Sequence, residues 1–184
     1  LRNSPVAIVP SLTDYTCAIA ASYDAKKLGI KTGTMIYEAK KKCPGLICIQ
    51  ADHEKYIYYH HKLIREINKY IPVEQVCSID EVACRLIGQE CNPKIIVHKA
   101  IEIKQGIKKN VGDYISFSIG ISSNKFLAKT ASNLQKPNGL KIISNHKIEE
   151  RLNHLKLSDL TGIGKRMEMK LHLSGITSVK KLYE

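Results

Sequence analysis

The sequence predicts an α+β fold. Its middle part, residues 53–122, alternates an amphipathic helix, two short strands that meet at a turn, a second helix and a further strand. This order would form a split βαβ sheet if one more strand preceded the first helix, and the 184 residues do not supply that strand. From about residue 145 the chain becomes helical and basic, which indicates a separate helical part.

Charge narrows the class of partner. Lys and Arg number 29 against 17 Asp and Glu, so the net charge is +12 and the pI is near 9.4. This balance favours a polyanionic partner, first nucleic acid and second an anionic membrane surface. The alternative is a lysine-rich composition that only keeps the protein in solution.

Other features of the composition exclude several classes. No apolar run approaches the roughly 18 residues of a membrane span, and nothing at the N-terminus resembles a signal peptide. The six cysteines contain no C-x-x-C pair, which favours free thiols in a reducing cytoplasm. The chain starts without Met and enters a strand-like run at once, so we interpret it as the interior of a longer protein.

The first 52 residues predict short alternating elements. Gly29 and the pair Pro44–Gly45 are natural helix stops. The expected elements are a strand at 5–9, a strand that turns into a helix at 17–30, a helix at 33–45 and a strand at 46–50.

The middle part has the clearest periodicity. Residues 53–71 place apolar and aromatic side chains at helical spacing, so Tyr56 and Tyr59 are expected to pack in the core. Adjacent His60 and His61 point in different directions on a helix and cannot chelate one ion. The further elements are strands within 73–88, a helix at 92–110 with Pro93 near its start, a strand at 113–122, a helix at 122–136 and a strand at 139–144.

An acid pair, Asp80 and Glu81, interrupts the apolar run at residues 76–87. Carboxylates are rarely buried without a partner, so a lysine, the solvent or a metal ion must neutralise them. Two carboxylates at a turn between strands suit a hard cation such as Mg²⁺, and two such ions support phosphoryl transfer. The alternative is a pair of turn residues that face water.

Four motifs resemble those of Y-family (lesion-bypass) DNA polymerases, the ImpB/MucB/SamB-like group. SIDE and FSIGISSNKFLAKTASNLQKPNGL resemble the palm, ASYDAKKLGIKTG the fingers, and LTGIGKRMEMKLHLSGI the thumb. The resemblance implies small α/β fingers at 1–52, an incomplete ferredoxin-like palm at 53–144 and a helix-hairpin-helix thumb at 145–184. It runs from about Pro5 to the last residue, with the motifs in the family's order.

The resemblance also implies a reaction and its site. Asp80 and Glu81 match the second and third carboxylates of a two-Mg²⁺ site that transfers a nucleotidyl group from a dNTP to a primer 3′-hydroxyl. Tyr23, Lys26 and Lys136 match residues that contact the triphosphate. The implied partners are primer–template DNA and dNTPs, with any sliding-clamp contact made by regions outside these residues, and no membrane.

The thumb-like motif is expected to bind DNA. Glycines let a backbone approach closely, so amides near Gly162 and Gly164 can hold a phosphate without reading sequence. Lys165 and Arg166 add positive charge at that point. The alternative is a plain turn between two helices.

The sequence also departs from the family pattern. Lys26 stands where arginine is usual, Ala20 replaces Thr or Ser, and Ala83 and Arg85 replace an aromatic residue and an acid. We expect altered packing beneath the acid pair and no loss of metal ligands.

The strand that carries the first metal carboxylate and the steric gate is not found in these residues, and Asp14 is no substitute for it. We therefore expect the chain alone to be an inactive fragment. The alternative functions are a non-catalytic DNA-binding protein that reuses the scaffold and a palm enzyme that forms RNA or cyclic nucleotides.

Overall fold

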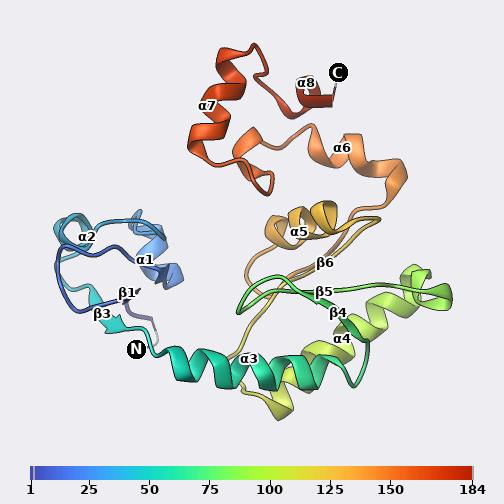
Figure 1. Cartoon of the computed structure of the whole chain (residues 1–184), viewed down its shortest axis with the longest axis horizontal. Helices are drawn as coiled ribbons and strands as arrows, with labels where there is room; N and C mark the ends of the chain where they lie inside the picture. The colour runs from blue at the N-terminus through green and yellow to red at the C-terminus, as the bar shows by residue number, and fades with distance from the viewer. Residues whose placement is uncertain (2, 184) are drawn as a thin grey trace. The chain divides into compact units, whose positions relative to one another are not determined.

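The computed structural model describes residues 1 and 3–183, and it divides them into two compact units, Leu1–Tyr58 and Tyr59–Glu184 (Figure 1). Helix α3 (His53–Ile67) begins in the first unit and continues into the second. No helix within the described residues is long and apolar enough to cross a membrane.

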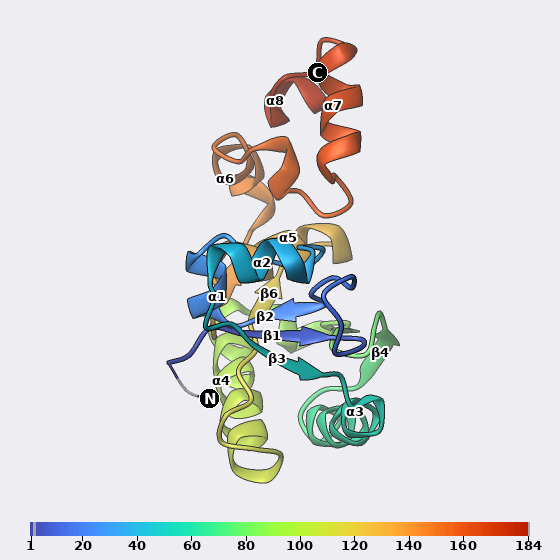
Figure 2. The same ribbon diagram turned by 90° about the vertical axis from the view of Figure 1, so that its left-hand side faces the viewer.

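The first unit is built on a three-stranded sheet in the order β2-β1-β3, with β1 between its two neighbours in Figure 2. Strand β1 (Val6–Val9) runs parallel to β3 (Ile47–Gln50) and antiparallel to β2 (Ala20–Ala21). Helices α1 (Tyr23–Lys27) and α2 (Ile36–Lys42) contribute their small or apolar faces to the core. That core contains Ala7, Val9, Ala18, Ala25, Ile30, Ile36, Ala39, Cys43 and Leu46.

The second unit holds two smaller sheets. Strands β4 (Val73–Val76) and β5 (Val82–Cys84) form an antiparallel hairpin, whereas β6 (Ile119–Ile121) and β7 (Leu140–Ile142) pair in parallel. Helix α5 (Lys125–Leu134) lies on one side of these strands, and α3 and α4 (Pro93–Asn110) lie on the other (Figures 1 and 2). A 3₁₀ turn, η1 (Gly88–Cys91), precedes α4.

The C-terminal part is helical, as the sequence predicts. It contains η2 (Asn145–Lys147), α6 (Ile148–Leu152), η3 (Leu157–Asp159), α7 (Lys165–Leu173) and α8 (Val179–Tyr183). These elements share one core with α5 and the end of β7, formed by Leu127, Ala131, Ile143, Leu152, Leu157, Leu160 and Val179. Helix α5 therefore connects the sheets to the helical part.

Helices α3 and α4 are joined by a buried carboxylate. The Glu66 side chain is 3% exposed. It accepts hydrogen bonds from Lys69 (2.6 Å), Asn110 (2.8 Å) and the Tyr70 hydroxyl (3.3 Å). Gly106 makes room for this group, because a Cβ at that position would lie 2.3 Å from the Tyr70 hydroxyl oxygen.

The structure corrects the expectations about one strand and about two tyrosines of α3. The strand predicted at 113–122 is confined to residues 119–121, because the Phe117 carbonyl accepts a hydrogen bond from Lys104 and the Ser118 hydroxyl binds a neighbouring loop. Tyr56 and Tyr59 are 39% and 41% exposed, because the apolar packing of α3 begins further along the helix.

Candidate metal and nucleotide site

The acid pair lies at the tip of the β4–β5 hairpin. The amides of Cys77 and Ser78 both donate to the Glu81 carbonyl, at 2.9 and 3.1 Å, and so close the turn. His60 on α3 also contacts the turn. Its Nδ1 atom lies 2.8 Å from the Ile79 carbonyl oxygen, and it must be the donor because a carbonyl only accepts. The backbone of Asp80 and Glu81 is thus held at several points.

The two carboxylates have different partners. Asp80 is exposed and accepts a hydrogen bond from the Ser78 hydroxyl at 2.7 Å. Glu81 forms an ion pair with Lys129 of α5. One carboxylate therefore has a neutral donor and open access to solvent, while the other has a cation supplied by the chain itself.

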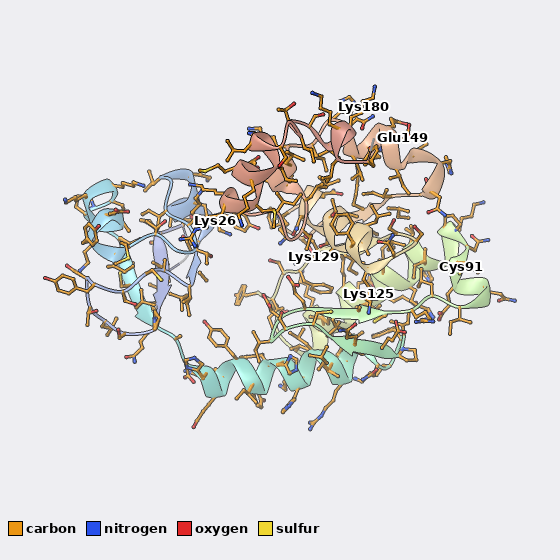
Figure 3. The ribbon with its side chains drawn as sticks, turned by 45° about the horizontal axis from the view of Figure 1, so that its top comes forward. Lys26, Cys91, Lys125, Lys129, Glu149 and Lys180 are labelled. Carbon is orange, nitrogen blue, oxygen red and sulfur yellow. The ribbon has the colours of Figure 1, made fainter. Side chains whose placement is uncertain are left out.

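Lys129 is a residue of the site that sequence reasoning missed. It and Lys125, one helical turn earlier, extend from α5 towards the hairpin, where Lys125 binds Gln75 (Figure 3). Burial and the nearby charge of Lys136 lower the pKa of Lys129, and the negative charge of Asp80 opposes that shift. The i, i+4 spacing of the two lysines was the available signal, because it places both on one helix face.

The donor chemistry of the pair fits a hard cation. Asp80 and Glu81 offer carboxylate oxygens on a turn whose backbone is fixed, and Mg²⁺ prefers oxygen ligands. Lys129 already contacts one Glu81 oxygen, so a cation there would share this carboxylate with an ammonium group. Within residues 1 and 3–183, no group of three or more His, Cys, Asp or Glu side chains is arranged to hold a metal ion.

Lys136 belongs to the same neighbourhood. It lies in the exposed loop between α5 and β7, and its charge acts on Lys129 together with that of Asp80. The second unit thus brings Glu81 of the hairpin and Lys129 of α5 into contact, and the charges of Asp80 and Lys136 both act on the pKa of Lys129.

Arg85, which replaces an acid of the family pattern, has a clear role in the hairpin. Its guanidinium lies 2.5 Å from a Glu74 carboxylate oxygen, so the exposed side chain, which directly follows β5, forms an ion pair with β4. Ala83 is half-buried in β5. Neither departure displaces the acid pair from the turn.

The other nucleotide-site candidates lie in the first unit. Ser22 caps α1 by accepting a hydrogen bond from the Ala25 amide at 3.2 Å, and Gly29, at φ 76°, follows the helix end. On this short helix the Lys26 ammonium lies 4.8 Å from the centre of the Tyr23 ring, in a cation–π contact. Both side chains are exposed.

The glycine motif forms the turn that leads into α7. Gly162 has a φ of +90°, which L side chains rarely adopt, and Gly164 is the N-cap residue of the helix. A Cβ at either glycine would meet no atom within 4 Å, so this backbone faces open space. Lys165 and Arg166 are exposed in the first turn of α7.

The family of the chain follows from a direct match. A family model described as "impB/mucB/samB family" covers residues 1–133. The chain belongs to this family. The family resemblance indicated by the sequence motifs is therefore confirmed.

Curated relatives carry the name DNA polymerase IV. The one from Acetivibrio thermocellus is 33% identical over 189 residues, which cover 99% of this chain and 45% of the relative. The one from Picrophilus torridus is 35% identical over 188 residues, covering 99% of this chain and 52% of the relative. The chain thus spans about half the length of the curated relatives it matches.

Solved structures give the same result for the fold. DinB from Sulfolobus solfataricus matches with a TM-score of 0.86 at 27% identity, over 99% of this chain and 53% of that one. An insertion ternary complex of Dbh DNA polymerase matches with a TM-score of 0.84 at 28% identity, over 99% and 54%. The mixed α+β fold is that of a Y-family palm and fingers, whereas the helix-hairpin-helix thumb stays a prediction.

Proposed function

We propose that this chain is the fingers, palm and thumb portion of a translesion DNA polymerase, which transfers a nucleotidyl group from a dNTP to a primer 3′-hydroxyl. One observation carries the proposal. The adjacent carboxylates Asp80 and Glu81 lie at a fixed hairpin turn, where Lys129 of α5 pairs with Glu81, and the charge of Lys136 lowers the pKa of Lys129. Carboxylates beside cations suit a reaction in which a negatively charged triphosphate meets bound metal ions.

In this proposal Asp80 and Glu81 hold metal ions through their carboxylate oxygens. Two Mg²⁺ ions, when bound, supply activation of the primer hydroxyl and stabilisation of the charge on the leaving pyrophosphate. Lys129 keeps Glu81 paired in the metal-free chain, which lowers the repulsion between the two adjacent carboxylates.

The remaining site residues bind and orient the substrates. Lys136 contacts the triphosphate from the loop after α5. Within the first unit, Tyr23 and Lys26 are the residues proposed to bind nucleotide. Because lysine lacks the two-pronged geometry of arginine, Lys26 acts as a point charge and not as a bidentate clamp.

The template–primer is held by its backbone. Amides around Gly162 and Gly164 approach a DNA phosphate, and Lys165 and Arg166 add positive charge. Such contacts do not depend on base sequence, which suits an enzyme that must accept distorted templates.

The metal ligands can be tested on the 184-residue chain by Mn²⁺ titration with electron paramagnetic resonance. We expect Mn²⁺ to bind, and Asp80→Asn and Glu81→Gln each to weaken binding at least about tenfold, a loss of ~1.4 kcal/mol. Asp113→Asn, which removes an exposed carboxylate of the same unit, is the matched control and should have no effect. Equal affinity in wild type and Asp80→Asn would reject the metal site.

We also propose that the 184 residues alone do not extend a primer. Two carboxylates leave the two-metal site short of a ligand, so primer extension with Mg²⁺ and dNTPs should yield no product. A product that disappears with Asp80→Asn would contradict this part of the proposal while supporting the assignment of the site.

A second candidate is a non-catalytic DNA-binding protein on the same scaffold. The ion pair between Glu81 and Lys129 favours it, because it neutralises one carboxylate without a metal ion. Fluorescence anisotropy with primer–template DNA separates the two functions. Binding of DNA by a chain that takes up no Mn²⁺ at Asp80 would favour the second candidate.

A further inference from the structure

Lys104 joins three segments of the second unit through one ammonium group. It lies in the middle of α4, and its Nζ atom donates to the Phe117 carbonyl (2.8 Å), the Asn138 carbonyl (3.0 Å) and the Asn138 side-chain oxygen (2.7 Å). An ammonium group has three protons, so all of them are used. The same Nζ lies 5.0 Å from the centre of the Phe117 ring.

These contacts fix the loop of residues 135–139, which carries Lys136. Ser118 also binds this loop. Its hydroxyl donates to the Gln135 carbonyl at 2.8 Å and accepts from the Gly139 amide at 3.0 Å. The loop is closed so tightly that a Cβ on Gly139 would lie 1.8 Å from the Gln135 carbonyl oxygen.

The position of Lys104 differs from that of an ordinary surface lysine. The residue is half-buried, and burial lowers the pKa of its ammonium group. Withdrawing this charge from water costs free energy, which the three charge-assisted hydrogen bonds offset. Two of the three bonds go to Asn138 in the loop that carries Lys136, and the third goes to the carbonyl of Phe117, next to Ser118, so the group is directed away from the helix that carries it.

We propose that Lys104 is a positioning residue for Lys136, holding the loop so that the Lys136 ammonium meets the triphosphate of a bound nucleotide. The inference rests on the proposed role of Lys136 in triphosphate binding. The Lys136 side chain is exposed, and its positive charge lowers the pKa of Lys129, the lysine that pairs with Glu81. A loop clamped at both flanks loses little conformational entropy when its lysine engages a phosphate, which favours binding.

The test measures the affinity of the full chain for Mg²⁺·dATP by calorimetry. Lys104→Met should weaken binding about tenfold, and Lys136→Met by a similar factor. The double variant should lose no more than either single one, because both changes remove the same positioned contact. Lys104→Arg should recover much of the affinity. Lys108→Met, on the exposed side of α4, is the matched control and should bind like wild type.

A second readout needs no nucleotide. Hydrogen exchange at the Gly139 amide should accelerate at least about tenfold in Lys104→Met and stay unchanged in Lys136→Met. Asn138→Gly is the alternative variant if Lys104→Met fails to fold. It removes the side-chain acceptor while keeping a residue that tolerates the φ of 54° found there, and it should weaken dATP binding in the same direction.

The possible failures are distinct. If Lys136→Met weakens binding and neither Lys104→Met nor Asn138→Gly does, the positioning role is wrong and the proposed function stands. If the losses from Lys104→Met and Lys136→Met add in the double variant, Lys104 acts independently and the inference is also wrong. If Lys136→Met binds dATP like wild type, the proposed triphosphate contact itself fails, and the inference falls with it.

Discussion

Replacing Glu66 by glutamine tests the buried joint between α3 and α4. The substitution keeps the size of the side chain and removes its charge. Glutamine can still accept from Asn110 and Tyr70 with its remaining oxygen, but its amide nitrogen then faces Lys69 as a donor facing a donor. The 2.6 Å contact with Lys69 is therefore lost.

The expected cost follows from the environment of the two partners. A hydrogen bond to a charged group contributes about 1.5–3 kcal/mol. Glu66 is 3% exposed, whereas the Lys69 side chain is 59% exposed and can regain water when its partner is removed. We therefore expect Glu66→Gln to lower the free energy of unfolding by about 1.5 kcal/mol, the lower end of that range.

The stabilisation by Glu66 should depend on pH in a defined direction. The hydrogen bond from Lys69 lowers the pKa of Glu66, so the folded state binds this proton less readily than the unfolded state. The contribution is present above the unfolded value, about 4.3 for glutamate, and is lost as the pH falls through the folded-state pKa. The difference between wild type and variant should therefore be constant from neutral pH down to about pH 5 and shrink below it.

Urea unfolding followed by circular dichroism, at neutral and acidic pH, measures both quantities. Glu149→Gln, an exposed glutamate of the same unit, is the control and should change stability by less than about 0.5 kcal/mol. The reasoning fails if Glu66→Gln is as stable as this control at neutral pH. It fails equally if the loss is undiminished well below the folded-state pKa.

Three further predictions concern close contacts and charge. Gly106→Ala should lower the free energy of unfolding by about 1–3 kcal/mol in urea titrations, because its Cβ would lie 2.3 Å from the Tyr70 hydroxyl oxygen. This clash outweighs the better helix propensity of alanine, and a more stable variant would contradict the prediction. Gly120→Ala should lower the free energy of unfolding by at least about 3 kcal/mol in the same assay, because its Cβ would lie 1.9 Å from the backbone carbonyl oxygen of Ala128. A near-neutral result would show that β6 can move away from α5. Lys129→Met should raise Mn²⁺ affinity about threefold or more, since it frees the Glu81 carboxylate from a partly exposed ion pair. Unchanged or weaker binding would mean that Lys129 helps to hold Glu81 in place as a metal ligand.

Much of the second unit could be predicted from sequence because its signals are local. Pro93 stands at the start of α4, where proline costs no hydrogen bond, and the apolar spacing of α3 marks a helix face. The turn around Asp80 and Glu81 lies between two strands as expected. The predicted helix at 53–71 is too long, because Asn68 accepts a hydrogen bond from the Val73 amide and starts the turn into β4.

The sequence by itself determined the type and approximate place of most helices and strands, the position of the acid pair at a hairpin, and the excess of positive charge. Only the tertiary structure decided the partners of the charged groups: Lys129 on Glu81, Lys104 on the loop of residues 135–139, and Glu66 between two helices. Secondary structure depends on neighbours a few residues apart, whereas these pairs join residues 34 to 48 positions apart. Which distant side chains meet is set by the packing of α4 and α5 against the strands, and that packing is a property of the whole core.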